Sequence, residues 1–192
     1  MHIQPLFTNF LAIDMLELDN ASMEAYALDL KSKQIGRQVS NAGGWQGLDL
    51  DMSAPEVKPL FDIVQEKLNE LHRQFEFADN MRFELFESWV NVNDKHHFNY
   101  PHTHAGSFFS GVYYVKSADN AGDIEFVSPI AAHEYTITTP MVKNFNEFNS
   151  NTWQVTPHVG KLILFPSWLT HFVRANHSDE NRISISFNSR LV

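Results

Sequence analysis

Two histidines separated by one residue, His102 and His104, are the first candidates for chemistry in this chain of 192 residues. They precede residues 108–115, a stretch of aromatic and β-branched residues that predicts a β-strand. Residues two apart in a strand point to the same face, so a strand that included the pair would let both imidazoles bind one metal ion. The alternative is coincidence, because the chain contains 10 histidines.

A third histidine, His171, follows a predicted strand in an apolar segment with Trp168, Leu169 and Phe172. Taken alone, a histidine in such surroundings is more often a hydrogen-bonded core residue than a metal ligand. The chain has no cysteine, so a metal ion would have to be held by His, Asp or Glu. His171 would then complete a three-histidine site with the His-x-His pair.

Arg182 and Ser184 share one face of a further predicted strand. An arginine on the inner face of a β-barrel needs an anionic partner, and the neighbouring predicted strands, residues 161–165 and 170–174, contain no Asp or Glu. This pattern indicates that the partner is a bound ligand. In the alternative arrangement Arg182 faces solvent, near the acidic residues that precede it.

The composition is typical of a globular protein, with 43% hydrophobic and 19% charged residues. A formal net charge of −9 argues against non-specific binding to nucleic acid or to anionic membranes. The first fifteen residues lack the features of a signal peptide, and no later stretch is long enough to span a membrane. We therefore expect a cytoplasmic protein with a single domain over residues 1–192.

The elements that must position these residues change in type along the chain. An edge strand is expected within residues 3–18, and helices over about 20–34 and 53–75, the second with Ser53 as its N-cap. After residue 81 the sequence predicts short strands at 82–93, 107–116, 123–128, 133–138, 153–156, 161–165, 170–174 and 182–188.

Helices followed by strands predict a mainly β fold, with a helical support region over residues 1–80 and a β core over 81–192. A double-stranded β-helix, the jelly-roll or cupin-like arrangement, fits this order best, and an irregular α+β sandwich is the alternative. Aromatic residues are expected to line the pocket inside this core: Tyr113, Tyr114, Phe126 and Trp168.

Taken together, His-x-His before a strand, one later His, and Arg-x-Ser eleven residues after it resemble the iron(II)- and 2-oxoglutarate-dependent oxygenases. Over almost its full length the chain is similar to small oxygenases of this superfamily from marine bacteria and phages. The shared motifs are GGWQ at 43–46, WVN at 89–91, SGVYY at 110–114, FPSWL-x-H at 165–171 and RISISFN at 182–188.

The resemblance implies iron(II) and 2-oxoglutarate as cofactors, and dioxygen as the oxidant of a second substrate that the sequence does not identify. It implies three metal ligands, His102, His104 and His171. Arg182 and Ser184 would bind the distal carboxylate of 2-oxoglutarate. Asn91 and Asn93 match the position of an Asn-x-Tyr pair that contacts 2-oxoglutarate in the nucleic-acid demethylases of this superfamily.

The sequence departs from the superfamily at His104, where other members carry Asp or Glu. Three neutral imidazoles can hold iron(II), but the site is then one negative charge poorer. In a second register His104 is the first ligand and Gly106 occupies the carboxylate position, which leaves a coordination position open. Two other functions fit parts of the pattern: a three-histidine zinc enzyme that activates water, and a non-catalytic jelly-roll binding module.

Overall fold

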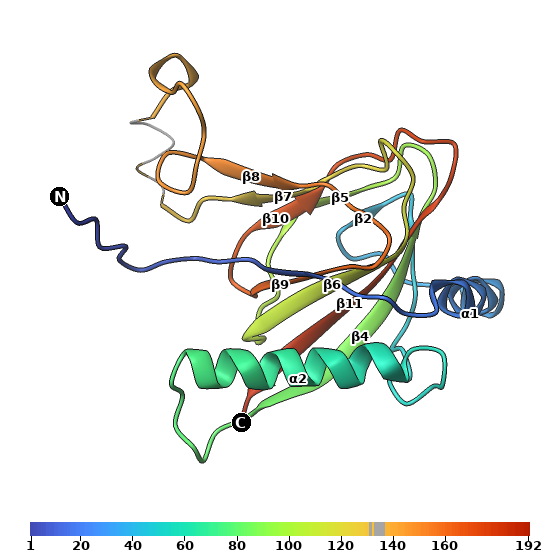
Figure 1. The fold of residues 1–192 in the computed structure, drawn as a ribbon. Helices are drawn as coiled ribbons and strands as arrows, with labels where there is room; N and C mark the ends of the chain where they lie inside the picture. Colours follow the sequence, from blue (N-terminus) through green and yellow to red (C-terminus); the bar gives the residue numbers. More distant parts are fainter. Residues whose placement is uncertain (131, 133–136) are drawn as a thin grey trace.

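The computed structural model describes residues 1–130, 132 and 137–192, which form two antiparallel β-sheets and two α-helices (Figure 1). The larger sheet has the strand order β1-β9-β6-β11-β4-β3. Its strands are β1 (Ala12–Met15), β3 (Trp45–Gln46), β4 (Phe83–Asn93), β6 (Phe109–Lys116), β9 (Lys161–Pro166) and β11 (Arg182–Leu191). The smaller sheet has the order β2-β5-β10-β7-β8. Its strands are β2 (Asn41–Ala42), β5 (Phe98–His102), β7 (Ile124–Val127), β8 (Thr152–Val155) and β10 (His171–Val173).

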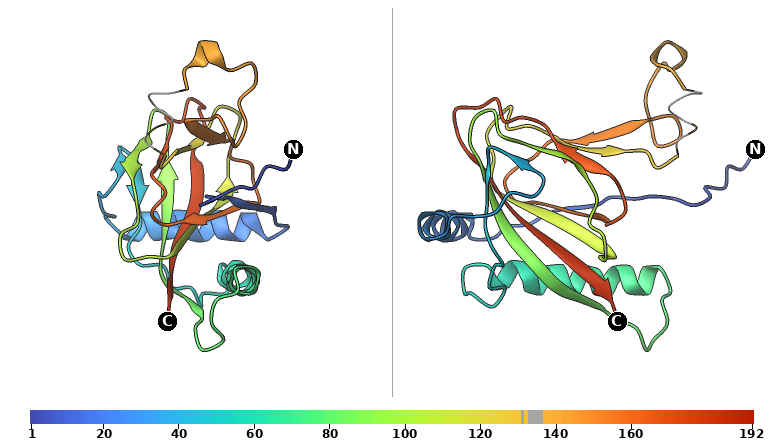
Figure 2. Two further views of the ribbon diagram at one scale, coloured as in Figure 1. Left: turned by 90° about the vertical axis from the view of Figure 1, so that its left-hand side faces the viewer. Right: turned by 180° about the vertical axis from the view of Figure 1, so that it is seen from behind.

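The two sheets lie over one another (Figure 2). A cavity between them is lined by residues of both sheets. Strand β11 lies in the middle of the larger sheet, paired with β4 on one side and β6 on the other. Successive residues of a strand point to opposite faces, so every second residue of β4 and β11 faces the cavity and the residues between them face outward.

Helix α2 (Lys58–Gln74) covers the outer face of the larger sheet (Figure 1). Its apolar residues recur at helical spacing and are buried: Leu60, Phe61, Val64, Leu68 and Leu71. The ring of Phe61 meets that of Phe187 on β11 edge-on at 6.2 Å. Each such side chain contributes about 1.5–3 kcal/mol through burial, so the helix stabilises the sheet from its outer face.

Helix α1 (Asn20–Lys33) agrees closely with the predicted range, and its N-cap is Asp19, whose carboxylate accepts from Ser22 N at 3.1 Å. Helix α2 begins five residues later than predicted. Ser53 is not its N-cap, because the Asp51 carboxylate accepts from both Ser53 N (2.9 Å) and Ser53 Oγ (2.6 Å) and holds a turn there. No helix in the described part of the chain is long and apolar enough to cross a membrane.

Seven of the strands predicted after residue 81 are confirmed within one to three residues at each end. The strand predicted at 133–138 falls mostly on residues outside the described ranges, and Thr138 leads into a short 3-10 helix, η1 (Thr139–Met141). The edge strand expected within 3–18 is β1. Strand β5 was not predicted, and with β2 and β3 it shows that the first hundred residues also contribute strands to both sheets.

A candidate metal centre in the cavity

Strands β5 and β10 bring two of the three candidate histidines face to face. His102 is the last residue of β5, His171 is the first of β10, and the two are directly paired in the antiparallel ladder. The strand predicted at 107–116 therefore does not include the His-x-His pair, since His102 ends the earlier strand β5. His104 lies in the connection that follows, where its backbone N–H donates to Ser167 O at 2.9 Å.

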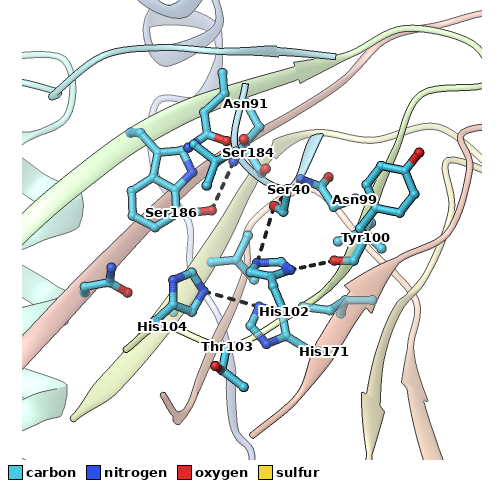
Figure 3. Close-up of a pocket in the computed structure, with 18 of the residues that line it drawn as sticks. Ser40, Asn91, Asn99, Tyr100, His102, Thr103, His104, His171, Ser184 and Ser186 are labelled. Atoms are coloured by element: carbon cyan, nitrogen blue, oxygen red, sulfur yellow. Dashed lines mark hydrogen bonds between the residues drawn. The ribbon is translucent and has the colours of Figure 1, made fainter. Parts of the chain in front are cut away.

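The three imidazoles point toward one another across a small space (Figure 3). One ring nitrogen from each lies within 4.8 Å of the other two, and Nε2 of His104 is 3.3 Å from Nε2 of His171. Nitrogens at these separations can close on a single ion with modest side-chain movement. The three residues therefore form a candidate metal centre.

Backbone carbonyls fix which nitrogen of two of the rings carries the proton. A carbonyl only accepts, so Nδ1–H of His102 donates to Tyr100 O at 2.7 Å, and Nδ1–H of His171 donates to Leu169 O at 3.0 Å. A proton on Nδ1 of a neutral ring leaves the Nε2 lone pair free. Second hydrogen bonds of this kind orient histidines that bind metals.

Burial keeps the three rings neutral. Loss of hydration lowers the pKa of His171 to about 3, and the nearby His102 and His104 lower it further than the Leu169 hydrogen bond raises it. Loss of hydration, with the neighbouring His102, lowers the pKa of His104 to about 4. The pKa of His102 is lowered by the same cause. All three are therefore in the form that a metal ion requires at neutral pH.

The cavity has a volume of about 410 Å³, and facing pairs from β4 and β11 form its floor. The pairs along this floor are Asn93–Arg182, Asn91–Ser184, Trp89–Ser186 and Glu87–Asn188. The ring of Trp89 lies 5.7 Å from that of His104, which places the metal centre above the Trp89–Ser186 pair. The floor thus extends away from the metal centre in both directions.

Arg182 lies at one end of this floor and is only 1% exposed. Its Nη1 donates to the carbonyls of Ala121 and Gly122, the second at 3.0 Å, and its Nη2 is buried with no partner. Within the described ranges no carboxylate pairs with it, because Asp179 and Glu180 pair with lysines instead. Burial lowers the pKa of Arg182, yet a guanidinium remains charged, so a buried cation with a free donor faces a cavity.

The other residues expected to contact a cosubstrate, Ser184, Asn91 and Asn93, all line the cavity. Asn91 Nδ2 donates to Ser186 Oγ at 3.1 Å (Figure 3). Asn93 Oδ1 is buried without a donor and lies against Gly44, where a Cβ atom would come within 2.1 Å of it. The glycine-rich loop therefore approaches β4 at the closed end of the cavity, beside Arg182.

Three of the four aromatic residues expected to line the interior lie outside the cavity. Tyr114 lines it, but the adjacent Tyr113 points to the other face of β6 and donates to Asn20 Oδ1 at 2.8 Å. Phe126 belongs to the core behind His171, with ring centroids 5.9 Å apart. Trp168 lies in the turn before β10 and is 54% exposed.

The structure does not bring Gly106 to the imidazoles. Gly106 has φ of +82° in a turn, and a Cβ atom added there would meet no atom within 4 Å. His102 occupies the third position around the centre instead. This placement favours the register with three histidines over the one with Gly106.

Residues 87–188, more than half of the chain, match the sequence model of the family described as "Putative 2OG-Fe(II) oxygenase". The chain belongs to this family. No curated protein matches it.

Several solved structures share the fold. A prolyl-4-hydroxylase from Pseudomonas putida is 15% identical, with 95% of this chain and 94% of that chain covered and a TM-score of 0.65. The epimerase SnoN, solved with Fe3+, alpha ketoglutarate and nogalamycin RO, is 14% identical over 95% and 79%, with a TM-score of 0.69. HygX from Streptomyces hygroscopicus, solved with nickel, 2-oxoglutarate and hygromycin B, is 14% identical over 95% and 83%, with a TM-score of 0.63.

Iron(II) and 2-oxoglutarate are the cofactors of 2OG-Fe(II) oxygenases, and the residues of this chain fit both. Three neutral imidazoles can hold iron(II). The buried Nη2 of Arg182, which lacks a partner, fits the carboxylate of a 2-oxo acid. The cavity joins these two features without an intervening acidic side chain among the described residues that line it, apart from Glu87 at the opposite end.

The end of the cavity opposite Arg182 contains residues that were not predicted from the sequence. Glu87 accepts from Asn188 Nδ2 at 2.8 Å and lies 3.4 Å from the Arg37 guanidinium. The rule of alternating faces, applied outward from Asn91 and Ser184, would have found Glu87 and Asn188. Arg37 offered no such signal, because it lies in a loop fifty residues before Glu87.

Proposed function

We propose that this chain is an iron(II)- and 2-oxoglutarate-dependent oxygenase that couples decarboxylation of 2-oxoglutarate to oxidation of a second substrate. In this proposal His102, His104 and His171 bind iron. Arg182 binds the distal carboxylate of 2-oxoglutarate, with Ser184, Asn91 and Asn93 as further polar contacts. The two sheets would form the double-stranded β-helix expected for this superfamily.

The observation that carries the proposal is the joint placement of two unusual features in one cavity. Three mutually close imidazoles line the same cavity as a buried guanidinium that has no carboxylate partner among the described residues. A hydrolytic metal site would explain the imidazoles but would leave the buried charge of Arg182 without a function, at a considerable free-energy cost. A chelating dicarboxylate explains both.

Bound iron(II) and 2-oxoglutarate would supply the redox chemistry: one atom of dioxygen would enter the succinate formed as 2-oxoglutarate loses carbon dioxide, and the other would oxidise the substrate. The protein contributes position and environment. Arg182 is fixed by the carbonyls of residues 121 and 122, so its free Nη2 is aimed before the ligand arrives. Preorganisation of this kind reduces the entropy lost on binding.

Tyr114 adds a second donor beside Arg182. It is paired across the strands with Ser184, and burial raises its pKa to about 12 against the opposing effect of the Arg182 charge. The phenol therefore keeps its proton and can donate to an anionic ligand. Apolar residues around the centre, including Val112, Ile124 and Phe165, limit the entry of water.

The test uses protein purified without oxygen. Addition of iron(II) and then 2-oxoglutarate should produce a visible metal-to-ligand charge-transfer band, because a 2-oxo acid that chelates iron(II) accepts charge from it. His171→Ala should abolish the band. Arg182→Gln should weaken 2-oxoglutarate binding about tenfold or more, since a charged hydrogen bond is lost.

His158→Ala is the matched control, because His158 is exposed and lies outside the cavity. It should leave the band unchanged. Thermal unfolding of each variant shows that it is folded. Absence of the band in the unaltered protein, together with tight binding of zinc in preference to iron, would contradict the proposal.

A further inference from the structure

We infer that the second substrate is a free α-amino acid, bound at the outer end of the cavity with its ammonium group on Glu87 and its carboxylate on Arg37. The inference rests on the proposed function, because it assigns that substrate to the space that 2-oxoglutarate does not use. It follows from the order of residues along the floor, from the contacts of Glu87 and Arg37, and from the volume available.

The register of β4 and β11 places the two charged ends of the cavity on opposite sides of the metal centre. From the Trp89–Ser186 pair, Arg182 and Asn93 lie four residues away in one direction, about 13 Å along a strand. Glu87 and Asn188 lie two residues away in the other direction, about 7 Å. A substrate held by Glu87 would therefore lie beside the metal without competing for Arg182.

Buried polar residues hold the Glu87 carboxylate in place. Asn188, 3% exposed, donates to Glu87 Oε2 at 2.8 Å and accepts from Ser110 Oγ at 2.8 Å. Ser110 Oγ in turn lies 2.7 Å from Ser167 Oγ. A carboxylate can accept about four hydrogen bonds, and this chain of contacts supplies one of them. These contacts hold the Glu87 carboxylate from the side away from the cavity. Its oxygens can still accept hydrogen bonds from a ligand in the cavity.

Arg37 lies at the same end of the cavity, and its guanidinium also has hydrogen-bond donors that no described residue accepts from. Its Nη2 is 3.4 Å from Glu87, its Nη1 is 3.9 Å from the exposed Asp49, and its Nε is buried without a partner. Its guanidinium lies 5.8 Å from the ring centroid of Trp89, the residue beneath the metal centre. A guanidinium has five N–H donors, so most of them are free for a ligand.

A side-by-side cation and anion select a ligand that carries both charges. A purely cationic substrate would be repelled by Arg37, and a purely anionic one by Glu87. In a free α-amino acid the ammonium and the carboxylate are attached to one carbon, so both protein groups can be satisfied together. A peptide residue lacks this pair, because at least one of the two groups is in an amide.

The volume supports a small substrate. The cavity of about 410 Å³ lies near the lower end of the range of about 300–1,000 Å³ for ligand pockets, and it must hold 2-oxoglutarate as well. The part of the second substrate that enters the cavity beside 2-oxoglutarate must therefore be about as small as an amino acid.

The test is a binding measurement on the full chain loaded with Mn²⁺ and 2-oxoglutarate, so that no turnover consumes the ligand. The twenty standard L-amino acids are added singly, and the shift in melting temperature and the calorimetric Kd are recorded. At least one should bind, whereas its N-acetyl and its amide derivatives should bind about tenfold more weakly or worse. No binding by any amino acid, or equal binding by a blocked derivative, would overturn the inference.

Variants test the assignment to the two residues. Glu87→Gln and Arg37→Gln should each weaken binding of that amino acid about tenfold or more. Glu84→Gln is the control, because Glu84 lies on the same strand with a similar side-chain exposure, 33% against 34% for Glu87, but outside the cavity. It should leave the Kd unchanged, and an equal effect of Glu84→Gln and Glu87→Gln would contradict the assignment.

The two proposals fail in different ways. If the unaltered protein shows no stabilisation by Mn²⁺ with 2-oxoglutarate, the proposed function is wrong. If that stabilisation is present and no amino acid adds to it, the oxygenase proposal stands and the substrate inference is wrong.

Discussion

At the scale of single residues, the centre consists of three neutral rings in a setting that resists protonation. His171 is 4% exposed, and its nearest titratable neighbours are the other two rings of the cluster. A metal ion bound by three imidazoles keeps its full charge of two, whereas a carboxylate ligand would reduce it. In the proposed centre, His104 in place of a carboxylate would therefore strengthen the attraction for anionic ligands.

The buried rings make the metal-free protein sensitive to mild acid. An unfolded histidine binds a proton near pH 6.5, whereas folded His104 and His171 bind one only near pH 4 and pH 3. Between these values the unfolded state holds more protons, so stability falls as the pH falls through this window. Each ring contributes up to about 1.4 kcal/mol per pH unit.

We therefore expect the free energy of unfolding of the metal-free protein to decrease between pH 6.5 and pH 5, where few carboxylates titrate. Urea unfolding at several pH values measures it. His171→Gln should flatten this dependence, and His158→Gln, at an exposed position, should not. A slope that is the same in all three proteins would show that His171 is readily protonated in the folded state.

A second prediction at this scale concerns His104 itself. His104→Asp should bind iron(II) at least as tightly as the unaltered protein, because an anionic oxygen ligand offsets the charge of the metal. His104→Ala should weaken binding about tenfold or more, as expected for loss of one ligand. Competition with a chelator that reports free iron(II) measures both. If His104→Ala leaves the affinity unchanged, His104 is not a ligand.

At the scale of elements, helix α2 supports the floor of the cavity from the opposite side of the sheet. Leu68→Ala should lower the free energy of unfolding by about 2–5 kcal/mol, since Leu68 is fully buried and a cavity remains. Glu66→Ala, on the exposed side of the same helix, should change it by less than about 0.5 kcal/mol. Denaturant unfolding measures both, and a small effect of Leu68→Ala would mean that the helix contributes little to the core.

The sequence predicts elements well where local pattern and burial agree, and less well elsewhere. Strands β4, β6, β9 and β11 of the larger sheet are rich in β-branched and aromatic residues, and the apolar positions of α2 recur at helical spacing, so these elements were predictable. Strand β5 was missed because Pro101 and two polar residues give it no such pattern. Strand β5 is defined by its pairing with β10 and β2, and this pairing is visible only in the folded chain.

Some residues of the candidate site could likewise be predicted from the sequence, and others could not. Strand alternation placed Arg182 and Ser184 on one face in advance, and the resemblance to the oxygenases indicated Asn91 and Asn93. All four line the cavity. The approach of Arg37 to Glu87 depends on how a distant loop crosses the sheet, and no local rule predicts this contact.

At the scale of the whole molecule, strands distant in sequence interlock. Strand β1 pairs with β9, and β11 lies between β4 and β6. Removal of residues 181–192 should abolish cooperative unfolding, because β4 and β6 would lose their shared neighbour. Removal of residues 2–5, which are exposed, should change the melting temperature little. Circular dichroism during heating distinguishes the two, and a cooperative transition without β11 would contradict the expectation.

The position of β11 in the chain also bears on how the protein is made. This strand comes after all the others in sequence, and it carries residues of both ends of the cavity, Arg182 and Asn188. While the chain is being synthesised, the histidines leave the ribosome before the strand that completes the cavity floor. The histidines of a nascent chain can therefore contact metal ions before β11 has been synthesised. The pocket for the cosubstrate can form only after β11 has left the ribosome.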